Sequence, residues 1–302
     1  MKKSLLSIVV FVSSIIFLFF THTDSSSVDA KEKDSNDSLN IESLEDGRVA
    51  PAENAKNLNE EELNQILIEI GHSMEDINHY PIDLKQEFVE LGGMKVEPDS
   101  EEVDHKLIID DEESEEVGTL ASCKPSDTNG NCSDGDWNGS VNLFKIGETS
   151  SQYQYIVQYR VHWEQTPFFT FKDKIGVHWG AFGQPVSGTA YGEGSAIDPV
   201  GDTIYFSMPM DLSSNYGFTG EYRFPCPDQT CRVQGRFGSM HEQINISKNQ
   251  YKPGEQLTIS AHHIHPHLPN NLSLSVALGG VSVSGLPSQY DEWTWRANFT
   301  LN

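Results

Sequence analysis

Three oxygen-bearing side chains at alternate positions form the most chemically suggestive motif of this chain. Asp134, Asp136 and Asn138 stand at every second position and are followed by a glycine. This order matches the opening of a calcium-binding loop, where alternate oxygen ligands converge on one ion and a glycine permits the sharp turn. The twelfth position should carry a bidentate glutamate, but Lys145 occupies it, which excludes an EF-hand. Two hypotheses remain: a simpler calcium loop, with calcium as the cofactor, and a turn in which Asp and Asn bond to their own backbone.

A run of histidines is the second candidate site. His263, His265 and His267 alternate along the chain, so their imidazoles would share one face of an extended segment. That is a chelating geometry for zinc, copper or nickel. Pro266 disturbs the alternation but keeps the segment extended. The alternative is an exposed polar loop between two strands.

The four cysteines are the third group of reactive residues. An even number of cysteines in an exported chain predicts disulfides, and short turn-rich spacings favour local pairing of Cys123 with Cys132 and of Cys226 with Cys231. Four cysteines allow three pairings, so the sequence does not decide between them. A structural zinc site is the alternative, although the spacings lack the close C-x2-C pair that zinc usually favours.

Aromatic residues recur with period two in the second half of the chain. In strands, such residues usually fill a core or pair across strands. We favour a core over the alternative, an exposed aromatic platform that binds sugar. The set comprises Tyr153, Tyr155, Tyr159, Trp163, Trp179, Trp293 and Trp295.

Motifs of nucleophilic and metal-dependent catalysis are missing from the sequence. It contains no G-x-S-x-G elbow, no H-E-x-x-H pair and no phosphate-binding loop. Paired carboxylates that hydrolyse glycosides meet only in the folded protein, so the sequence leaves them open. These observations favour a protein without catalytic activity.

The first 30 residues predict export. Lys2 and Lys3 precede an apolar run of 16 residues, 5–20, and a polar stretch then leads to Val28-Asp29-Ala30. This order is that of a secretory signal peptide with a cleavage site after Ala30. The run is shorter than the roughly 20 residues of a membrane-spanning helix, so we do not expect stable membrane insertion. We expect a secreted protein, extracellular or associated with the cell wall.

Acidic residues are concentrated in one part of the chain. Residues 31–120 contain 27 acidic and 7 basic residues, and so hold −20 of the total net charge of −25. A block of this density repels phosphate backbones and anionic membrane surfaces. We therefore exclude nucleic acid as a partner.

Within the acidic block the sequence predicts three segments. Residues 31–57 have no apolar period and are expected to be disordered. Residues 58–93 form a small helical unit, in which Asn59 and Glu62 make a capping box and Gly71 ends the first helix. Residues 94–120 form an acidic linker. The apolar stripe of the first helix comprises Leu63, Ile66, Leu67 and Ile70.

Residues 121–302 change to a period of two. Short strands separated by Gly, Pro, Asn and Asp turns predict an antiparallel β-sandwich domain. The expected fold class is therefore mainly β, with a signal peptide and a small acidic helical segment before the sandwich. Strands are expected over residues 153–163, 168–179, 203–208, 217–224, 232–237, 244–247, 256–261, 272–284 and 292–301.

One expected hairpin spans residues 272–284. A two-residue turn at Gly279-Gly280 would pair Leu278 with Val281 and Val276 with Val283. Every aliphatic side chain then lies on one face. A half-buried hairpin of the sandwich is the favoured interpretation, and a membrane-inserting hairpin is the alternative.

Two stretches resemble known secreted proteins. The segment Glu61–Gly93 contains Ile70-Gly71-His72-Ser73, Tyr80-Pro81 and Leu91-Gly92-Gly93, and it resembles a helical pre-domain of uncharacterised secreted proteins of Gram-positive spore formers. The segment Tyr251–Ile259 resembles the turn-to-strand signature of bacterial immunoglobulin-like domains. The resemblance implies an immunoglobulin-like sandwich and carries over no catalytic residues.

The sequence therefore favours a secreted, non-catalytic β-sandwich protein that binds cell-envelope glycan or another extracellular protein. One alternative is an extracellular hydrolase kept latent by residues 31–120 as a propeptide. The other is a secreted toxin or antimicrobial protein.

Overall fold

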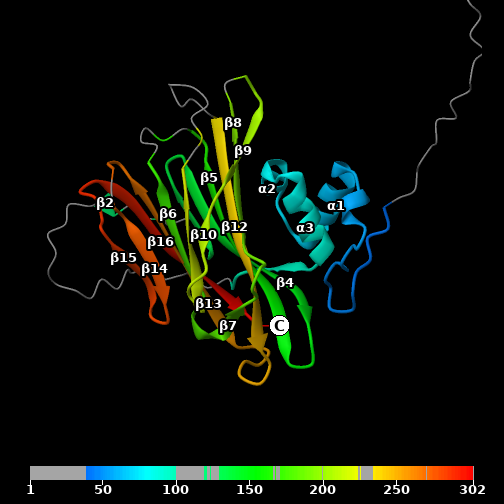
Figure 1. Ribbon diagram of the computed structural model, residues 1–302. Helices are drawn as coiled ribbons and strands as arrows, with labels where there is room; N and C mark the ends of the chain where they lie inside the picture. Colours follow the sequence, from blue (N-terminus) through cyan, green and yellow to red (C-terminus); the bar gives the residue numbers. More distant parts are fainter. Residues whose placement is uncertain are drawn as a thin grey trace, which may run out of the picture. The chain divides into compact units, whose positions relative to one another are not determined.

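Alternation of apolar side chains with period two builds two sheets that pack face to face (Figure 1). A computed structural model describes residues 39–99, 119–120, 123, 129–165, 167, 171–198, 200–223, 225, 234–269 and 271–301. The described residues from Asn40 onward form one unit. The expected fold class, mainly β and antiparallel with a small helical segment before the sandwich, is confirmed. The predicted signal peptide lies outside the described residues.

The first sheet has eight strands. Its main path runs β1-β4-β5-β12-β8-β9, β3 pairs with β4, and β7 pairs with β12. All of these pairs are antiparallel. The strands are β1 (Met94–Val96), β3 (Asn131–Asp134), β4 (Trp137–Glu148), β5 (Gln152–Trp163), β7 (Gly183–Pro185), β8 (Tyr191–Ile197), β9 (Thr203–Ser207) and β12 (Gln234–Ser247).

The second sheet has six strands in the order β10-β11-β6-β13-β16-β2. Its pairs are antiparallel except for β2 with β16. A short 3-10 helix, η2 (Gly180–Phe182), follows β6. The strands are β2 (Thr119–Leu120), β6 (Asp173–His178), β10 (Met210–Asp211), β11 (Gly217–Tyr222), β13 (Gln256–Pro266) and β16 (Tyr290–Thr300).

The space between the sheets is filled by the alternating residues of both inner faces. On β5 the inward residues run from Tyr153 to Trp163 at every second position, and on β16 Trp293 and Trp295 face them. The prediction that the aromatics form a core is confirmed, because the whole predicted set is buried there. A sugar-stacking platform would need exposed rings, and these rings are not exposed.

One acidic residue lies among these apolar side chains. Glu242 of β12 pairs with Val157 and shares its inner face with Met240 and Ile244. It is 2% exposed, and burial raises the pKa of its carboxyl to about 7. The folded protein therefore holds this group protonated over a pH range in which the unfolded chain ionises it.

Glu242→Gln is expected to stabilise the protein at pH 8 and to have little effect at pH 5. The raised pKa means that the carboxyl costs no stability below its ordinary pKa of about 4.5, and that the cost grows as pH rises toward 7. Glutamine keeps the shape of the neutral acid without ionising, so the gain at pH 8 should be about 2–3 kcal/mol. Urea denaturation at both pH values measures it. Equal effects of the substitution at pH 5 and pH 8 would contradict the assignment of a buried neutral acid.

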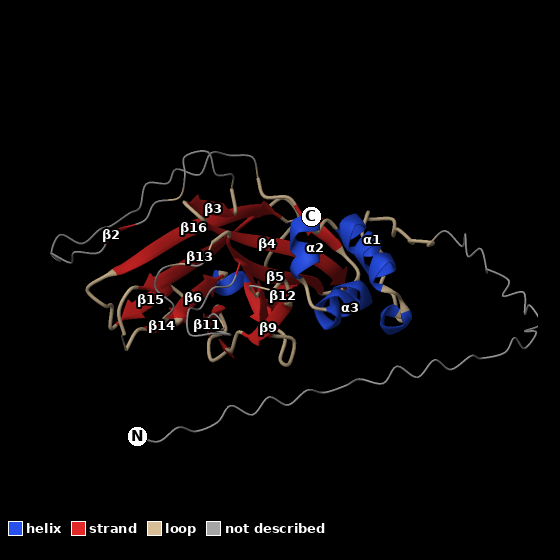
Figure 2. Ribbon diagram, turned by 90° about the horizontal axis from the view of Figure 1, so that it is seen from above, coloured by secondary structure: helices blue, strands red, loops and turns tan. Residues whose placement is uncertain are grey.

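Three helices cover the outer face of the first sheet (Figure 1, Figure 2). They are α1 (Glu60–Ile70), α2 (Met74–His79) and α3 (Ile82–Leu91), and a 3-10 helix, η1 (Ala55–Asn57), precedes them. The predicted capping box is confirmed, because Asn59 accepts a hydrogen bond from the Glu62 amide and Glu62 accepts one from the Asn59 amide. Gly71 ends α1 in the left-handed region, with a φ of 106°. The predicted stripe of α1 is buried throughout.

The helical segment is docked on the sheet by aromatic rings. His72 stacks on Phe144 of β4, with ring centroids 4.4 Å apart, and lies 4.5 Å from the ring of Phe88. The hydroxyl of Tyr80 accepts a hydrogen bond of 2.9 Å from Gln158 of β5. The chain that leaves α3 then joins the sheet itself as β1. The small helical core therefore gains much of its stability from the sandwich.

The segment before the helices corrects the expectation of disorder over 31–57. Residues 39–57 are ordered: Val49 forms bridges with Ser43 and Gly93, and Ala52 donates a backbone hydrogen bond to Val89 of α3. Polar composition hides this order because backbone hydrogen bonds, rather than an apolar stripe, hold most of the segment. Residues 31–38 lie outside the described part of the chain.

The expected hairpin exists but with a different register. It consists of β14 (Ser273–Ala277) and β15 (Gly280–Ser284), and Val276 pairs with Val281 instead of Val283. The turn is Leu278-Gly279, so Leu278 is at the tip and 58% exposed. A shift of two residues keeps every aliphatic side chain on the same face, so the pattern decides the face and not the register.

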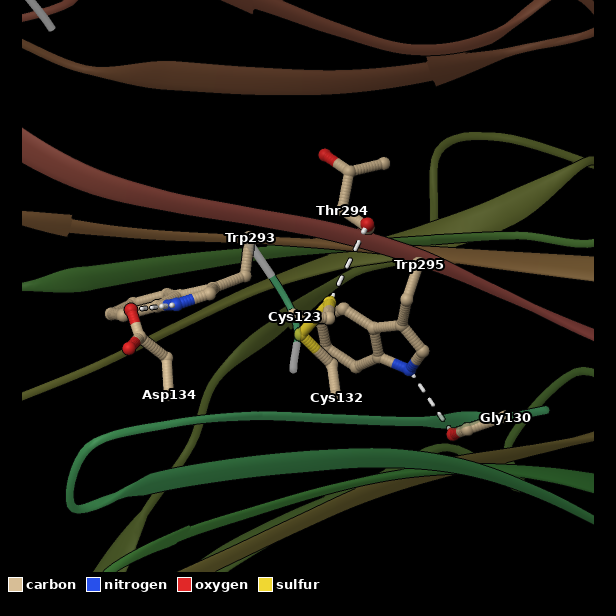
Figure 3. The surroundings of a disulfide bond; sticks show 7 residues. All are labelled: Cys123, Gly130, Cys132, Asp134, Trp293, Thr294 and Trp295. Carbon is tan, nitrogen blue, oxygen red and sulfur yellow. Dashed lines mark hydrogen bonds between the residues drawn. A yellow bond between two sulfur atoms is a disulfide. The ribbon is translucent and has the colours of Figure 1, made fainter. Parts of the chain in front are cut away.

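The predicted Cys123–Cys132 disulfide is present (Figure 3). Cys132 lies on β3, and Cys123 lies near the backbone of Thr294 on β16, so the bond ties β3 to a part of the chain that borders the second sheet. Figure 3 also shows the indole of Trp295 donating to the carbonyl of Gly130 over 3.1 Å. Cys226 and Cys231 lie outside the described residues, and their pairing stays a prediction.

Candidate functional site

The predicted calcium motif forms the tight turn between β3 and β4. Asp134 pairs with Trp137 across a two-residue turn at Gly135-Asp136, and Gly135 has a φ of 56°. The carboxylate of Asp134 accepts a hydrogen bond of 3.2 Å from the indole of Trp293 (Figure 3). Asn138 points into a separate polar hollow. The motif thus forms a turn, as the alternative hypothesis expects, but both the calcium loop and the bonding of Asp and Asn to their own backbone stay predictions.

The predicted histidine cluster faces inward, onto a buried carboxylate. His263 is fully buried, and its Nε2 lies 3.0 Å from one oxygen of Asp173 on β6. His265 Nδ1 lies 2.7 Å from the other oxygen. The hydroxyl of Tyr159 on β5 lies 2.6 Å from His263 Nδ1. One carboxylate therefore joins two strands of the second sheet, and a tyrosine connects them to the first.

The two imidazoles are held in different protonation states. Burial lowers the pKa of His263, so this ring is neutral and donates its Nε2 proton to Asp173 while Nδ1 accepts from Tyr159. The pKa of His265 is raised, because the nearby Asp173 charge outweighs the effect of burial. Burial would raise the pKa of Asp173, but His265 and the hydrogen bonds from both rings hold it below its ordinary value. Asp173 and His265 thus form a buried ion pair.

His267 binds a second carboxylate, and its ring lies edge-on to that of His265 with centroids 5.7 Å apart. Its Nε2 lies 2.9 Å from Asp291 of β16, and both side chains are partly exposed. Within the described part of the chain, no three His, Cys, Asp or Glu side chains are grouped as ligands of a metal ion. The transition-metal hypothesis for His263, His265 and His267 stays a prediction, and the structure gives two of these residues a structural role in the core.

A hollow of about 340 Å³ lies on the opposite side of the sandwich from the helices. Strands β6, β13 and β16 form its floor, and the tip of the β14–β15 hairpin forms its wall. Except for the buried Ala261, the floor residues point away from the core because they alternate with the buried ones. The lining comprises His178, Thr258, Ser260, Ala261, His262, Gly279, Gly280, Val281, Thr294 and Arg296.

The chemistry of this hollow is that of hydrogen-bond donors. Arg296 supplies a guanidinium and lies on an exposed position of β16, and hydroxyl groups come from β13 and β16. His262 Nε2 is in contact with Glu292. His178 Nε2 lies 3.2 Å from the carbonyl of Leu278 and fastens the hairpin tip to the floor. None of the residues that line the hollow is acidic.

Gly176 of β6 allows the hairpin to approach the sheet. A Cβ atom at this position would lie 2.7 Å from Cγ1 of Val281. At the base of the hairpin, Ile264, Leu272, Leu274 and Tyr290 form a small apolar cluster. The hairpin therefore contacts the sheet in three places: through the apolar cluster at its base, through close packing on Gly176 at its middle, and through the hydrogen bond to His178 at its tip.

Gly176→Ala is expected to lift the hairpin and weaken its packing by about 1–3 kcal/mol, because the added methyl overlaps Val281. Val281→Ala in the same chain should restore the packing, since it removes the overlapping methyls. Amide hydrogen exchange of β14 and β15 measures both effects. Exchange that is unchanged in the single variant, or unrestored in the double variant, would contradict this role of Gly176.

In two other hollows the basic side chains are already bound to carboxylates. One of about 280 Å³ lies beside α2, where Arg160 and His162 are bound to Glu75 at 2.9 Å each and Arg160 also contacts Asp76. The other, of about 260 Å³, lies on the far side of the hairpin, where Lys174 contacts Glu221. A charged ligand would have to break these pairs to bind there.

Sequence reasoning missed the residues of the large hollow. In the sequence, nothing distinguishes Thr258, Ser260 and Thr294 from ordinary solvent-facing positions of strands. Arg296 is a single charged residue between apolar neighbours. Their convergence depends on the order β6-β13-β16 and on a hairpin that folds back over them. A partial signal was present: the run Gly279-Gly280 marks the tip that closes the hollow.

No protein-family model matches the sequence, and no curated protein shows significant similarity to it. Among solved structures, the collagen-binding subdomain ACE19 of the Enterococcus faecalis surface protein ACE is 11% identical, with a TM-score of 0.26, and the match covers 49% of this chain and 89% of that one. The collagen-binding domain of a Staphylococcus aureus adhesin is 7% identical, with a TM-score of 0.26, over 49% of this chain and 99% of that one. The C-terminal domain of the Streptococcus agalactiae AgI/II polypeptide BspA is 9% identical, with a TM-score of 0.28, over 59% and 60%. Scores this low establish neither a family nor a function.

Proposed function

We propose that this is an extracellular binding protein that holds an extended polypeptide segment in the hollow beneath the β14–β15 hairpin. The observation that carries the proposal is the free edge of β15. Among the described strands β15 pairs with β14 alone, and its first residues line the hollow. An unpaired strand edge offers backbone N–H and C=O groups to an incoming extended chain.

The lining of the hollow favours a polypeptide over a glycan. Sugar-binding sites use exposed aromatic faces, whereas the tryptophans of β16 turn into the core. Ser260 and Thr294 offer hydroxyls that both donate and accept, Thr258 offers a hydroxyl that donates to Asn298 and can still accept, and Val281 offers an apolar contact. These groups suit the alternating polar and apolar sides of an extended peptide.

The disulfide supports an extracellular location. Disulfides persist in oxidising compartments and are rare in the cytosol, and the Cys123–Cys132 bond is formed. Among the described residues, no helix is both long enough and apolar enough to span a bilayer. Export by the predicted signal peptide is part of the proposal.

The docking of the helical segment disfavours a propeptide that spans residues 31–120. Removing it would strip β1 from the first sheet and expose Phe144 and Phe237, which the helical segment covers. A binding protein needs no such removal. The mass of the secreted protein tests this point: a form beginning near Lys31 agrees with the proposal, and a form beginning near residue 121 supports the hydrolase alternative.

A binding screen with a blocked variant tests the function. Immobilised matrix polypeptides, collagen among them, are compared with a glycan array. Thr294→Trp fills the hollow from an exposed position, and Thr203→Trp makes the same change on the exposed edge strand β9. We expect polypeptide binding that is lost in Thr294→Trp and retained in Thr203→Trp. Binding to glycans alone, or binding that ignores both substitutions, would overturn the proposal.

A further inference from the structure

We infer that the polypeptide segment bound in the hollow carries a carboxylate side chain, which Arg296 binds; this inference rests on the proposed function. Arg296 is the one residue of the lining that is positively charged at every physiological pH. Among the described residues, no acidic side chain forms an ion pair with its guanidinium, and the lining of the hollow contains none. An arginine fork in such a setting matches a carboxylate with two parallel hydrogen bonds.

One acidic side chain of β16 already has a partner beside the hollow. Glu292 contacts Nε2 of His262, which is itself a lining residue. The hydroxyls of Ser260 and Thr294 lie in the same lining as Arg296 and supply further donors. A carboxylate that enters the hollow therefore meets donors from two adjacent strands.

The strongly negative net charge does not oppose this inference at close range. The acidic side chains that begin α1, Glu60 to Glu62, lie with the helices on the outer face of the first sheet (Figure 1, Figure 2). The hollow is lined by residues on the outer face of the second sheet. At ionic strengths near 0.15 M, exposed charges farther apart than about 8 Å are largely screened. The acidic side chains of α1 are therefore expected to have little influence on the preference of the hollow for a ligand.

Selectivity for an acidic ligand also agrees with a lining that holds a guanidinium and hydroxyl groups but no acidic side chain. A neutral extended peptide could satisfy the β15 edge but would leave the guanidinium with water alone. A basic peptide would bring two like charges together without any acidic partner in the lining. Among the three classes of peptide, the acidic one gains a charge-assisted contact.

A matched peptide series tests the inference on the full secreted chain. The probes are three capped hexapeptides, (Thr-Glu)3, (Thr-Gln)3 and (Thr-Lys)3, titrated at constant ionic strength and followed by amide chemical shifts in NMR. We expect (Thr-Glu)3 to bind about tenfold more tightly than (Thr-Gln)3 and to perturb the amides of β13, β15 and β16. We expect (Thr-Lys)3 to bind more weakly than both.

Four variants separate this inference from the proposed function. Arg296→Gln should abolish the preference for (Thr-Glu)3 while leaving the affinity for (Thr-Gln)3 unchanged, and Arg296→Lys should retain part of it. Lys56→Gln removes one exposed positive charge from the helical side and should change nothing. If (Thr-Glu)3 and (Thr-Gln)3 bind equally and only Thr294→Trp abolishes binding, the carboxylate inference fails and the proposed function stands. If no peptide perturbs the hollow in any variant, both fail.

Discussion

Asp173→Asn is expected to destabilise the protein by about 3–5 kcal/mol, the largest effect of any single substitution that we predict. Asparagine has nearly the same shape as aspartate. Its amide, however, has one hydrogen-bond acceptor and one donor group, whereas the carboxylate has two acceptor oxygens. The rings of His263 and His265 both donate to the carboxylate, so one of them would face the amide nitrogen and lose its partner. Breaking a buried ion pair by removing one charge leaves the other charge uncompensated.

Urea denaturation at pH 6 measures this effect, and Asp291→Asn is its matched control. Asp291 also binds a histidine, His267, but both of these side chains are partly exposed. Exposed pairs are usually worth less than about 1 kcal/mol, so the control should lose no more than that. A loss below 1 kcal/mol in Asp173→Asn would show that the buried network contributes little to stability.

The same substitution should change the dependence of stability on pH. The lowered pKa of Asp173 gives stability that is present above its ordinary pKa and is lost as pH falls. The raised pKa of His265 gives stability that is present below its ordinary pKa of about 6.5 and is lost as pH rises through the folded value. The network is therefore strongest in the mildly acidic range between these limits, and Asp173→Asn should flatten both slopes.

Local rules predicted the parts of this fold that neighbouring residues decide. The capping box of Asn59 and Glu62 needs residues three apart, and it is present. The short Cys123–Cys132 loop is also local, and it is bonded as expected. The inward face of β5 follows from alternation alone. Each of these features depends on contacts within about ten residues of the chain.

Contacts between distant residues decided the features that sequence reasoning missed. Asp173 meets His263 across 90 positions of the chain, and neither residue has a local neighbour that announces the pair. Histidines at alternate positions resemble a metal-binding motif when only the sequence is seen. Their partner carboxylate lies on another strand, so the local sequence does not reveal it. The hollow has the same origin, since a glycine on β6 seats a hairpin about 100 residues later. Sheet order and hairpin packing thus determine the candidate site.

The interface between the helices and the first sheet contains four histidines, so we expect the docking of the helices to depend strongly on pH. His72 and His79 belong to the helical side, and His162 and His241 belong to the sheet. Burial, together with the nearby Lys95 and His241, lowers the pKa of His72 to about 3. Burial likewise lowers the pKa values of His79 and His162. These histidines therefore remain neutral in the docked helical segment at pH values at which they would bind a proton in the undocked segment.

The sign of the resulting pH dependence follows from this difference. Below about pH 6.5 an undocked His72 binds a proton that the docked ring refuses, so docking weakens as pH falls from about 6.5 toward 3. His72 is packed between Phe88, Phe144 and the Tyr80 hydroxyl, which lies 3.1 Å from its Nδ1. Asp76 opposes the trend, because burial raises its pKa and its protonation in the docked state favours docking in acid.

Lowering the pH from 7 to 4 is thus expected to weaken docking of the helical segment by about 3 kcal/mol, while the sandwich core stays folded. Amide hydrogen exchange resolves the two regions: protection of α1 to α3 should fall steeply with pH, and protection of β13 and β16 should not. His72→Phe keeps a ring between Phe88 and Phe144 without a titrating group, and Gln158 still binds the Tyr80 hydroxyl. Most of the pH dependence of the helices should therefore disappear in this variant. If His72→Phe shows the same pH dependence as the unmodified chain, the effect belongs to His79 and His162 instead. If the helices of the unmodified chain are as protected at pH 4 as at pH 7, the predicted weakening of docking is wrong.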